Sequence, residues 1–96
     1  MNEIAIIIPG YNCEKYIQKC LKSIFAQKYN DYTIFFIDDG STDSTKDIIS
    51  SIRNEHLIYK YQLNAGVSAA RNMGLQLAKE FEYVMFVDAD DWLEEG

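Results

Sequence analysis

Cysteine and histidine are scarce in this sequence, which has two cysteines, Cys13 and Cys20, and one histidine, His56. In a helix, residues 13 and 20 would lie two turns apart, about 10 Å along the axis, whereas a disulfide needs Cα atoms within about 7 Å. Neither cysteine belongs to a CxxC or Cys/His metal motif. The sequence therefore argues against a disulfide scaffold or a zinc site, and we expect buried, reduced thiols.

Proline, glycine and long apolar runs are scarce as well. One proline and five glycines exclude a collagen-like or low-complexity chain. The first apolar run, residues 4–8, is too short for a signal peptide, and no run approaches the ~20 apolar residues of a membrane helix. We therefore expect a cytoplasmic chain, whose full-length protein lies peripherally at the cytoplasmic face of the membrane.

Positive charge is in deficit, because the formal net charge is −6. The lysines are scattered among acidic residues, so no basic face is available to displace counterions from nucleic acid. We therefore expect no nucleic-acid partner. The negative charge is concentrated at residues 38–39 and 88–91, and clustered carboxylates with little base nearby favour a bound cation.

What the sequence does contain is four runs typical of strands, at residues 4–8, 34–37, 57–63 and 83–87. The first, second and fourth are uninterrupted apolar runs, the pattern of strands buried on both faces of a parallel sheet. The third alternates between apolar and polar residues, which predicts a position near a sheet edge.

Helical periodicity fills the intervals between these strands, at residues 16–25, 48–52 and 69–78. Asn12 is placed to cap the first helix, and the segment Ser41-Thr42-Asp43 is placed to cap the second. Gly74 lies inside the third helix, which favours a close helix–sheet contact. The order β-α-β-α-β-α-β predicts an α/β fold with a Rossmann-like, doubly wound, mostly parallel sheet.

The fourth strand is followed by the motif Asp88-Ala89-Asp90. Two carboxylates two positions apart project to the same side of extended chain. A hard divalent cation such as Mg²⁺ or Mn²⁺ relieves their repulsion and commonly bridges to substrate phosphates. The alternative is a solvated turn or a helix cap, but the apolar strand before the motif and the further acid at Asp91 favour the metal site.

Two other strand ends carry polar residues, and ligands of doubly wound sheets bind beyond such ends. The acids at Asp38 and Asp39 could accept hydrogen bonds from a base or a ribose, and turn chemistry alone does not explain them. The loop at residues 64–66 leads into a helix with Arg71, so backbone amides and one positive charge could face an anion. The alternative for Arg71 is an exposed helix residue paired with an acid.

Four motifs in order resemble family 2 glycosyltransferases of the GT-A fold. They are IIIPGYN at residues 6–12, IDDGSTD at 37–43, NAG with ARN at 64–72, and VDADD at 87–91. The family's nucleotide-binding positions correspond to Pro9, Tyr11, Asp38, Asp39, Arg71 and Asp88, and its metal-binding positions to Asp88 and Asp90.

The resemblance implies a role for each of these positions. Pro9 and Tyr11 would shape the wall of the base pocket, and Asp39 would recognise the base, usually uracil, with Asp38 supporting it. Arg71 would lie near the base and phosphates, and Asp88 near the ribose and the metal. Asp90 would be the main ligand of Mn²⁺ or Mg²⁺, which neutralises the leaving nucleoside diphosphate.

The implied reaction is inverting transfer of a sugar from a nucleotide donor, with a UDP-sugar favoured, to a saccharide, lipid or protein hydroxyl, as in polysaccharide biosynthesis. Inversion needs a carboxylate base, and the family's base lies downstream of the DxD motif. We therefore expect residues 1–96 to be the donor-binding part of a single truncated domain, without a catalytic residue and inactive alone. The sheet edge beside the fourth strand predicts self-association.

Other classes fit less well. A receiver-like phospho-acceptor domain needs an acidic pair after the first strand, where this sequence has Pro9-Gly10-Tyr11. A dinucleotide oxidoreductase needs more glycines at the same place. A non-catalytic module that binds a nucleotide or a partner protein stays open, and turnover by the full-length protein would separate it from an enzyme.

Overall fold

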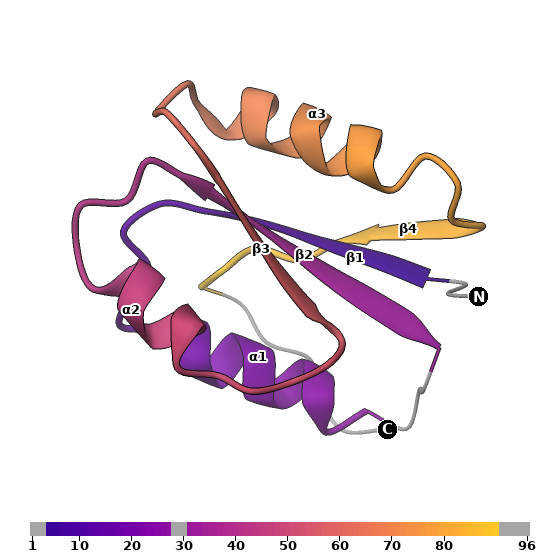
Figure 1. Ribbon diagram of the computed structural model, residues 1–96, viewed down its shortest axis with the longest axis horizontal. Coiled ribbons are helices and arrows are strands. Elements are labelled where there is room, and N and C mark those ends of the chain that lie inside the picture. The colour runs from indigo at the N-terminus through magenta and orange to yellow at the C-terminus, as the bar shows by residue number, and fades with distance from the viewer. Residues whose placement is uncertain (1–3, 28–30, 91–96) are drawn as a thin grey trace.

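Strands and helices alternate along the chain (Figure 1). The computed structural model describes residues 4–27 and 31–90. The strands are β1 (Ile4–Gly10), β2 (Tyr32–Asp39), β3 (Leu57–Gln62) and β4 (Tyr83–Phe86), and the helices are α1 (Ile17–Phe25), α2 (Thr45–Ser50) and α3 (Val67–Leu77). The predicted element order and the α/β class are confirmed.

The four strands form one parallel sheet in the order β3-β2-β1-β4. From β1 the chain winds outward through β2 to β3, and then crosses back through α3 to place β4 on the other side of β1. The winding direction therefore reverses between β1 and β4, which confirms the doubly wound prediction. Ligands of such sheets bind at this point, beyond the carboxyl ends of the strands.

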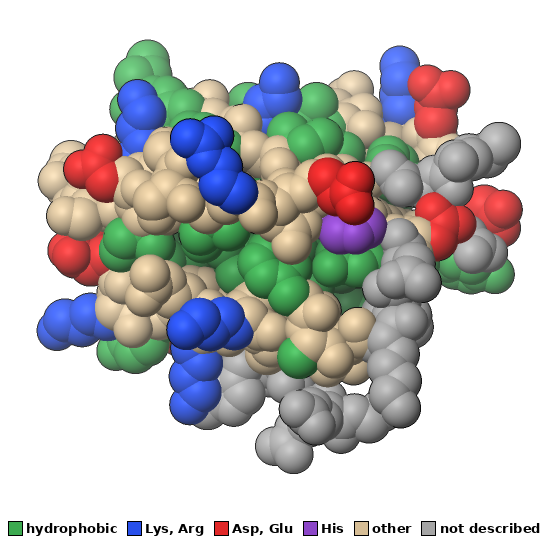
Figure 2. All heavy atoms as spheres, turned by 60° about the horizontal axis from the view of Figure 1, so that its bottom comes forward, with side chains coloured by type: hydrophobic (Ala, Val, Ile, Leu, Met, Phe, Trp, Pro, Cys, Tyr) green, Lys and Arg blue, Asp and Glu red, His purple; other side chains and the backbone are tan. Residues whose placement is uncertain are grey.

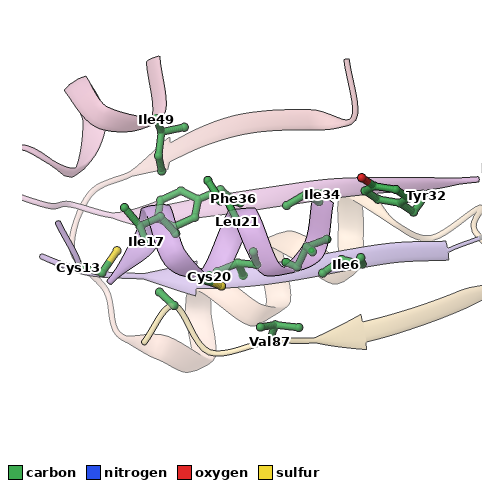
Figure 3. Packing of buried hydrophobic residues seen from close by; sticks show 13 residues of the cluster. Ile6, Cys13, Ile17, Cys20, Leu21, Tyr32, Ile34, Phe36, Ile49 and Val87 are labelled. Atoms are coloured by element: carbon green, nitrogen blue, oxygen red, sulfur yellow. The ribbon is translucent and has the colours of Figure 1, made fainter. Parts of the chain in front are cut away.

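Helices cover both faces of the sheet, with α1 and α2 on one face and α3 on the other (Figure 1). Alternate residues of β1 serve the two faces, because Ile6 and Ile8 pack toward α1 while Ala5 and Ile7 pack toward α3. Figure 3 shows the α1 side, where the helix lays Ile17, Cys20 and Leu21 over the sheet. Removing aliphatic side chains of this kind from water stabilises the fold by about 1.5–3 kcal/mol each.

The α3 layer lies close to the sheet at Gly74. A Cβ atom built on Gly74 would lie 2.4 Å from Cγ2 of Ile7, which no real Cβ tolerates. The predicted close contact of this helix with the sheet is therefore confirmed, and Ala70 and Ala78, both buried, extend it along the helix. Small residues on this stripe allow α3 to pack against β1 and β2.

Both cysteines are free and buried, as predicted. Burial raises the pKa of the Cys13 thiol to about 11, so this thiol stays protonated at neutral pH. Within the described residues, no helix is long and apolar enough to cross a membrane. On the face that Figure 2 shows, the described lysine and arginine side chains are interspersed with aspartate and glutamate and form no continuous patch.

Three local predictions are wrong. β4 was predicted to be buried on both faces, but most of its residues are exposed and Tyr83 is 61% exposed. Asn12 does not cap α1, because the helix begins after Tyr16 and Asn12 has a φ of 48°. The cap position of α2 is Ser44, not the segment 41–43, although Oδ1 of Asp43 accepts a hydrogen bond from the N–H of Thr45 at 2.9 Å. β3 alternates and lies at the other edge, as predicted.

Candidate functional site

Two adjoining pockets lie at the carboxyl ends of the strands and share one wall. The Asp39 pocket has a volume of about 280 Å³ and is lined by Pro9, Gly10, Tyr11, Asp39, Asn64, Gly66, Val67 and Ala70. The Asp88 pocket has a volume of about 420 Å³ and is lined by Pro9, Gly10, Tyr11, Asn12, Cys13, Tyr16, Asp88, Ala89 and Asp90. The end of β1 and Tyr11 therefore separate the two pockets at the point where the winding reverses.

The carboxylate of Asp39 is held by four hydrogen-bond donors from the end of β3 and the loop after it. Oδ1 accepts from Nε2 of Gln62 at 2.7 Å and from the N–H of Ala65 at 2.8 Å. Oδ2 accepts from the N–H of Gly66 at 3.0 Å and from Nδ2 of Asn64 at 3.4 Å. Asp39 thus orders the loop that leads into α3, and only 5% of the residue is exposed.

These contacts keep Asp39 ionised. Burial raises the pKa of this carboxyl, but the hydrogen bonds from Ala65, Gln62 and Gly66 together outweigh burial and hold the pKa below its usual range. The pocket wall therefore presents a fixed, negatively charged acceptor. The contact with Asn64 is the longest of the four, so a ligand N–H could replace it at the smallest cost.

Asp38 lies behind the pocket rather than in it. Residues alternate across a strand, so Asp38 continues the face of Ile34 and Phe36, which packs toward α1. Its carboxylate is fully buried and accepts hydrogen bonds from the N–H of Ser41 at 2.9 Å and from the hydroxyl of Tyr59. Asp38 therefore holds the turn after β2 and does not line the Asp39 pocket, a position compatible with the expected supporting role behind Asp39.

The hydrogen bond between the buried Asp38 and the half-buried Tyr59 connects β2 to β3. Burial, followed by the hydrogen bond to Asp38 and its negative charge, raises the pKa of Tyr59 well above its usual range. The phenol therefore stays protonated and keeps donating to the carboxylate. Gly40 then turns the chain with a φ of 75°, and this left-handed conformation suits glycine as the sequence indicated.

The Asp88 pocket is built from exposed acids. Both Asp88 and Asp90 line it and both are exposed. Nη2 of Arg71 lies 3.9 Å from Oδ1 of Asp88, and these side chains are 47% and 62% exposed. The guanidinium of Arg71 also lies 5.9 Å from the ring centroid of Phe86. Arg71 is therefore brought to the Asp88 side of the site and does not line the Asp39 pocket.

Asp88 and Asp90 are two carboxylates that could contribute oxygen ligands to a metal ion. Among residues 4–27 and 31–90, no group of three or more His, Cys, Asp or Glu side chains is placed to hold a metal ion, and Asp91 lies outside the described residues. Two carboxylates facing a water-accessible pocket fit a hard cation such as Mg²⁺ or Mn²⁺, which takes its remaining oxygens from water and a diphosphate.

Sequence reasoning missed Gln62 and Asn64, the two side chains that hold Asp39. The available signal was their place at the carboxyl end of the third strand, where Gln62 is the last strand residue and Asn64 lies in the loop that follows. Parallel neighbouring strands bring their carboxyl ends together, and Asp39 lies in register with Gln62. Pro9 and Tyr11 were identified from the sequence, and the structure places both in the wall that the two pockets share.

Comparison with known proteins gives one consistent result. Residues 5–96 match the family model described as glycosyl transferase family 2. The chain is 45% identical over 96 residues to "Glycosyltransferase GlyA" of Streptococcus pneumoniae, covering 98% of this chain and 14% of that protein. It is 39% identical over 93 residues to the Escherichia coli "UDP-Glc:alpha-D-GlcNAc-diphosphoundecaprenol beta-1,3-glucosyltransferase WfaP", covering 96% of this chain and 37% of that protein.

The fold agrees with solved structures as well. A crystal structure of S. aureus TarS 1-349 in complex with UDP-GlcNAc superposes with a TM-score of 0.87 at 37% identity, covering 94% of this chain and 27% of that one. This similarity confirms the expected GT-A architecture. The chain spans about 14% to 37% of the length of these three proteins.

Proposed function

This chain belongs to glycosyl transferase family 2, and from that membership we propose that it is the donor-binding part of a glycosyltransferase that uses a nucleoside-diphosphate sugar. One observation carries the proposal: a fixed buried carboxylate and a pair of exposed carboxylates line adjoining pockets at the switch point of the sheet. A nucleoside diphosphate has the matching shape, with a hydrogen-bonding base at one end and a cation-binding diphosphate at the other. The S. aureus TarS complexes with UDP-GlcNAc and with UDP support this reading.

The Asp39 pocket is proposed to take the base. Pro9 and Tyr11 offer apolar surface to a flat ring, and the ionised Asp39 accepts a hydrogen bond from a ring N–H. A uracil ring has one such N–H between two carbonyl groups, so uridine donors fit this acceptor. We therefore propose a UDP-sugar as the donor.

The Asp88 pocket is proposed to take the diphosphate. Asp88 and Asp90 would hold Mn²⁺ or Mg²⁺ there, since both carboxylates line the pocket and both are exposed. When bound, the cation supplies positive charge that stabilises the leaving diphosphate. Arg71, next to Asp88, adds a second positive charge at the same side of the site.

We propose that other parts of a longer protein carry the remainder of the reaction, since the chain spans 14% and 37% of the two curated relatives. Inverting transfer to a saccharide, lipid or protein hydroxyl needs a carboxylate base. We propose that none of the described residues is that base. We propose a cytoplasmic location, with the full-length protein at the membrane face. We also propose self-association of this chain through β4, whose Tyr83 is 61% and Phe86 44% exposed at the sheet edge. A light-scattering mass of one chain at high concentration would contradict that association.

A calorimetric titration of UDP into the protein, with and without Mn²⁺, tests the proposed function. We expect binding that Mn²⁺ strengthens, that Asp90→Ala weakens at least about tenfold in the presence of Mn²⁺, and that Asp39→Asn weakens without the metal as well. Glu80→Ala, which removes an exposed acid outside both pockets, is the matched control and should leave the affinity unchanged. Tighter binding of GDP or dTDP than of UDP would refute the uridine assignment, and no binding of any of the three by folded protein would refute the donor site.

A further inference from the structure

The loops after β1 and β2 are joined by reciprocal hydrogen bonds. Three successive backbone N–H groups of the first loop donate to side-chain oxygens of the second loop and of Thr45, the first residue of α2. The pairs are Asn12 N with Ser41 Oγ at 2.9 Å, Cys13 N with Thr45 Oγ1 at 3.0 Å, and Glu14 N with Asp43 Oδ2 at 3.3 Å. None of these donors is used by a strand or a helix, so the second loop satisfies the backbone of the first.

The side chain of Asn12 in turn accepts hydrogen bonds from the backbone of the second loop. Its Oδ1 accepts from the N–H of Thr42 at 2.8 Å and from the N–H of Asp43 at 3.2 Å. Asn12 is also the one residue other than glycine with a positive φ among those described, at 48°. Asparagine tolerates this left-handed conformation better than most residues. We call the contacts between residues 12–14 and 41–45 the Asn12 latch.

The latch fixes the position of Tyr11, a residue that lines both pockets. Strand β1 ends at Gly10, so Tyr11 has no place in the sheet, and its residue is 51% exposed. Tyr11 lines the Asp39 pocket and the Asp88 pocket. Its position is therefore set on one side by β1 and on the other by Asn12. The N–H of Ser41, a residue of the latch, donates in turn to the buried Asp38.

We propose that Asn12 is a positioning residue for the nucleotide-sugar site: its side-chain amide holds Tyr11 in the wall between the two pockets. The identity of the ligand rests on the proposed function, but the latch itself does not. A wall residue that is ordered before binding spares the ligand the entropy cost of ordering it. Loss of the amide should therefore weaken nucleotide affinity although Asn12 need not donate to the nucleotide.

The binding test compares three variants of Asn12 by UDP titration with Mn²⁺. Asn12→Ala removes the acceptor and disfavours the positive φ, and we expect the dissociation constant to rise about tenfold. Asn12→Gly keeps the backbone conformation but lacks the acceptor, so it should bind as weakly as Asn12→Ala or nearly so. Asn12→Asp keeps an acceptor oxygen for Thr42 and Asp43, so it should restore most of the affinity.

The matched control is Asn54→Ala. Oδ1 of Asn54 accepts a hydrogen bond from the N–H of His56 at 2.8 Å, just before β3 and thus at the opposite end of the sheet. This variant loses the same kind of contact and should leave the affinity for UDP unchanged. Equal weakening by Asn54→Ala and Asn12→Ala would overturn the proposal, because the effect would then be one of general stability. Full affinity in Asn12→Gly would also overturn it, since the amide would then be dispensable.

A ligand-free measurement keeps the inference testable if no nucleotide binds and the proposed function fails. Hydrogen exchange reports each backbone N–H separately. In Asn12→Ala we expect the amides of Thr42 and Asp43 to exchange about tenfold faster, while amides in the centre of β2 stay as in the wild type. Unchanged exchange at both amides would show that Asn12 does not hold the second loop and would overturn the latch.

Discussion

The two pockets differ in how much of their geometry the protein fixes before a ligand binds. In the Asp39 pocket, Asp39 is 5% exposed as a whole residue and its carboxylate is fixed by four donors. In the Asp88 pocket the Asp88 side chain is 62% exposed, and among the described residues it forms an ion pair with Arg71 at 3.9 Å. One pocket therefore has its geometry before a ligand arrives, and the other depends on what binds in it.

The difference follows from the positions of the strands in the sheet. Asp39 ends β2, which has neighbours on both sides and supplies a fully buried strand. Asp88 follows β4, which is an edge strand with most of its residues exposed. A carboxylate in the interior must be hydrogen-bonded to be tolerated, whereas a carboxylate at the edge is hydrated and can exchange water for a cation. Stability and binding should therefore respond differently in the two pockets.

The largest effect on stability should come from Asp39→Ala. The change leaves the N–H groups of Ala65 and Gly66 and the amide of Gln62 without their acceptor. A hydrogen bond to a charged group contributes about 1.5–3 kcal/mol net, and Ala65 and Gly66 are exposed so that water reaches the freed donors; we therefore expect a loss of about 2–4 kcal/mol in the free energy of unfolding. Urea denaturation followed by circular dichroism measures it. Glu80→Ala, at an exposed position, should change stability by less than about 0.5 kcal/mol, and equal losses in the two variants would remove the distinction between the pockets.

A smaller effect is the pH dependence that Asp39 contributes. Its pKa is lowered in the folded protein, so its contribution to stability is complete above the unfolded value of about 3.9 and is lost as pH falls through the folded value. The stability difference between wild type and Asp39→Asn should therefore be constant from about pH 7 to pH 5 and shrink below about pH 4. Urea midpoints at a series of pH values give this difference. Asp43, whose pKa is also lowered, cancels because both proteins contain it.

Most of the fold could be predicted from the sequence, because apolar period and turn residues report local structure. The order of elements was predicted correctly from such patterns. The burial of β4 was not, since an apolar run states what residues 83–87 prefer and not which neighbours the sheet gives them. The cap assigned to Asn12 failed for a similar reason: its partners Thr42 and Asp43 are 30 and 31 residues away.

The residues of the site could be predicted from the sequence, but the role of each residue could not. The sequence identified Asp38 and Asp39 together as candidates for the nucleotide. Alternation along a strand already implies that neighbours face opposite ways, and the structure shows which one faces the pocket. Only the register of β2 against β3 reveals that Gln62 holds Asp39 and that Tyr59 holds Asp38. Register is a non-local property, so pattern reasoning on one strand could not supply it.

Removing the acids of the Asp88 pocket should affect nucleotide binding much more than the stability of the fold. The variant Asp88→Asn with Asp90→Asn removes two exposed charges that no buried donor requires, so we expect the free energy of unfolding to change by less than about 0.5 kcal/mol. The same double variant should lose at least about tenfold in affinity for UDP in the presence of Mn²⁺. Urea denaturation and calorimetry on one preparation measure both quantities. A stability loss comparable with that of Asp39→Ala would show that this pocket, too, is built in advance.

The smallest expected effect is the coupling between Arg71 and Asp88. Their charged atoms are 3.9 Å apart and both side chains are about half exposed or more, so water and salt screen the attraction and side-chain entropy opposes it. A double-mutant cycle with Arg71→Gln and Asp88→Asn should give a coupling below about 0.5 kcal/mol that disappears in 0.5 M salt, about five times the ionic strength at which the Debye length is 10 Å. Repeating the cycle with UDP and Mn²⁺ present should give a larger coupling, because the bound diphosphate and cation displace water from between the two side chains. A coupling above about 1 kcal/mol in the free protein would mean that Arg71 orders Asp88 before any ligand binds, and the contrast between the two pockets would then be one of exposure alone.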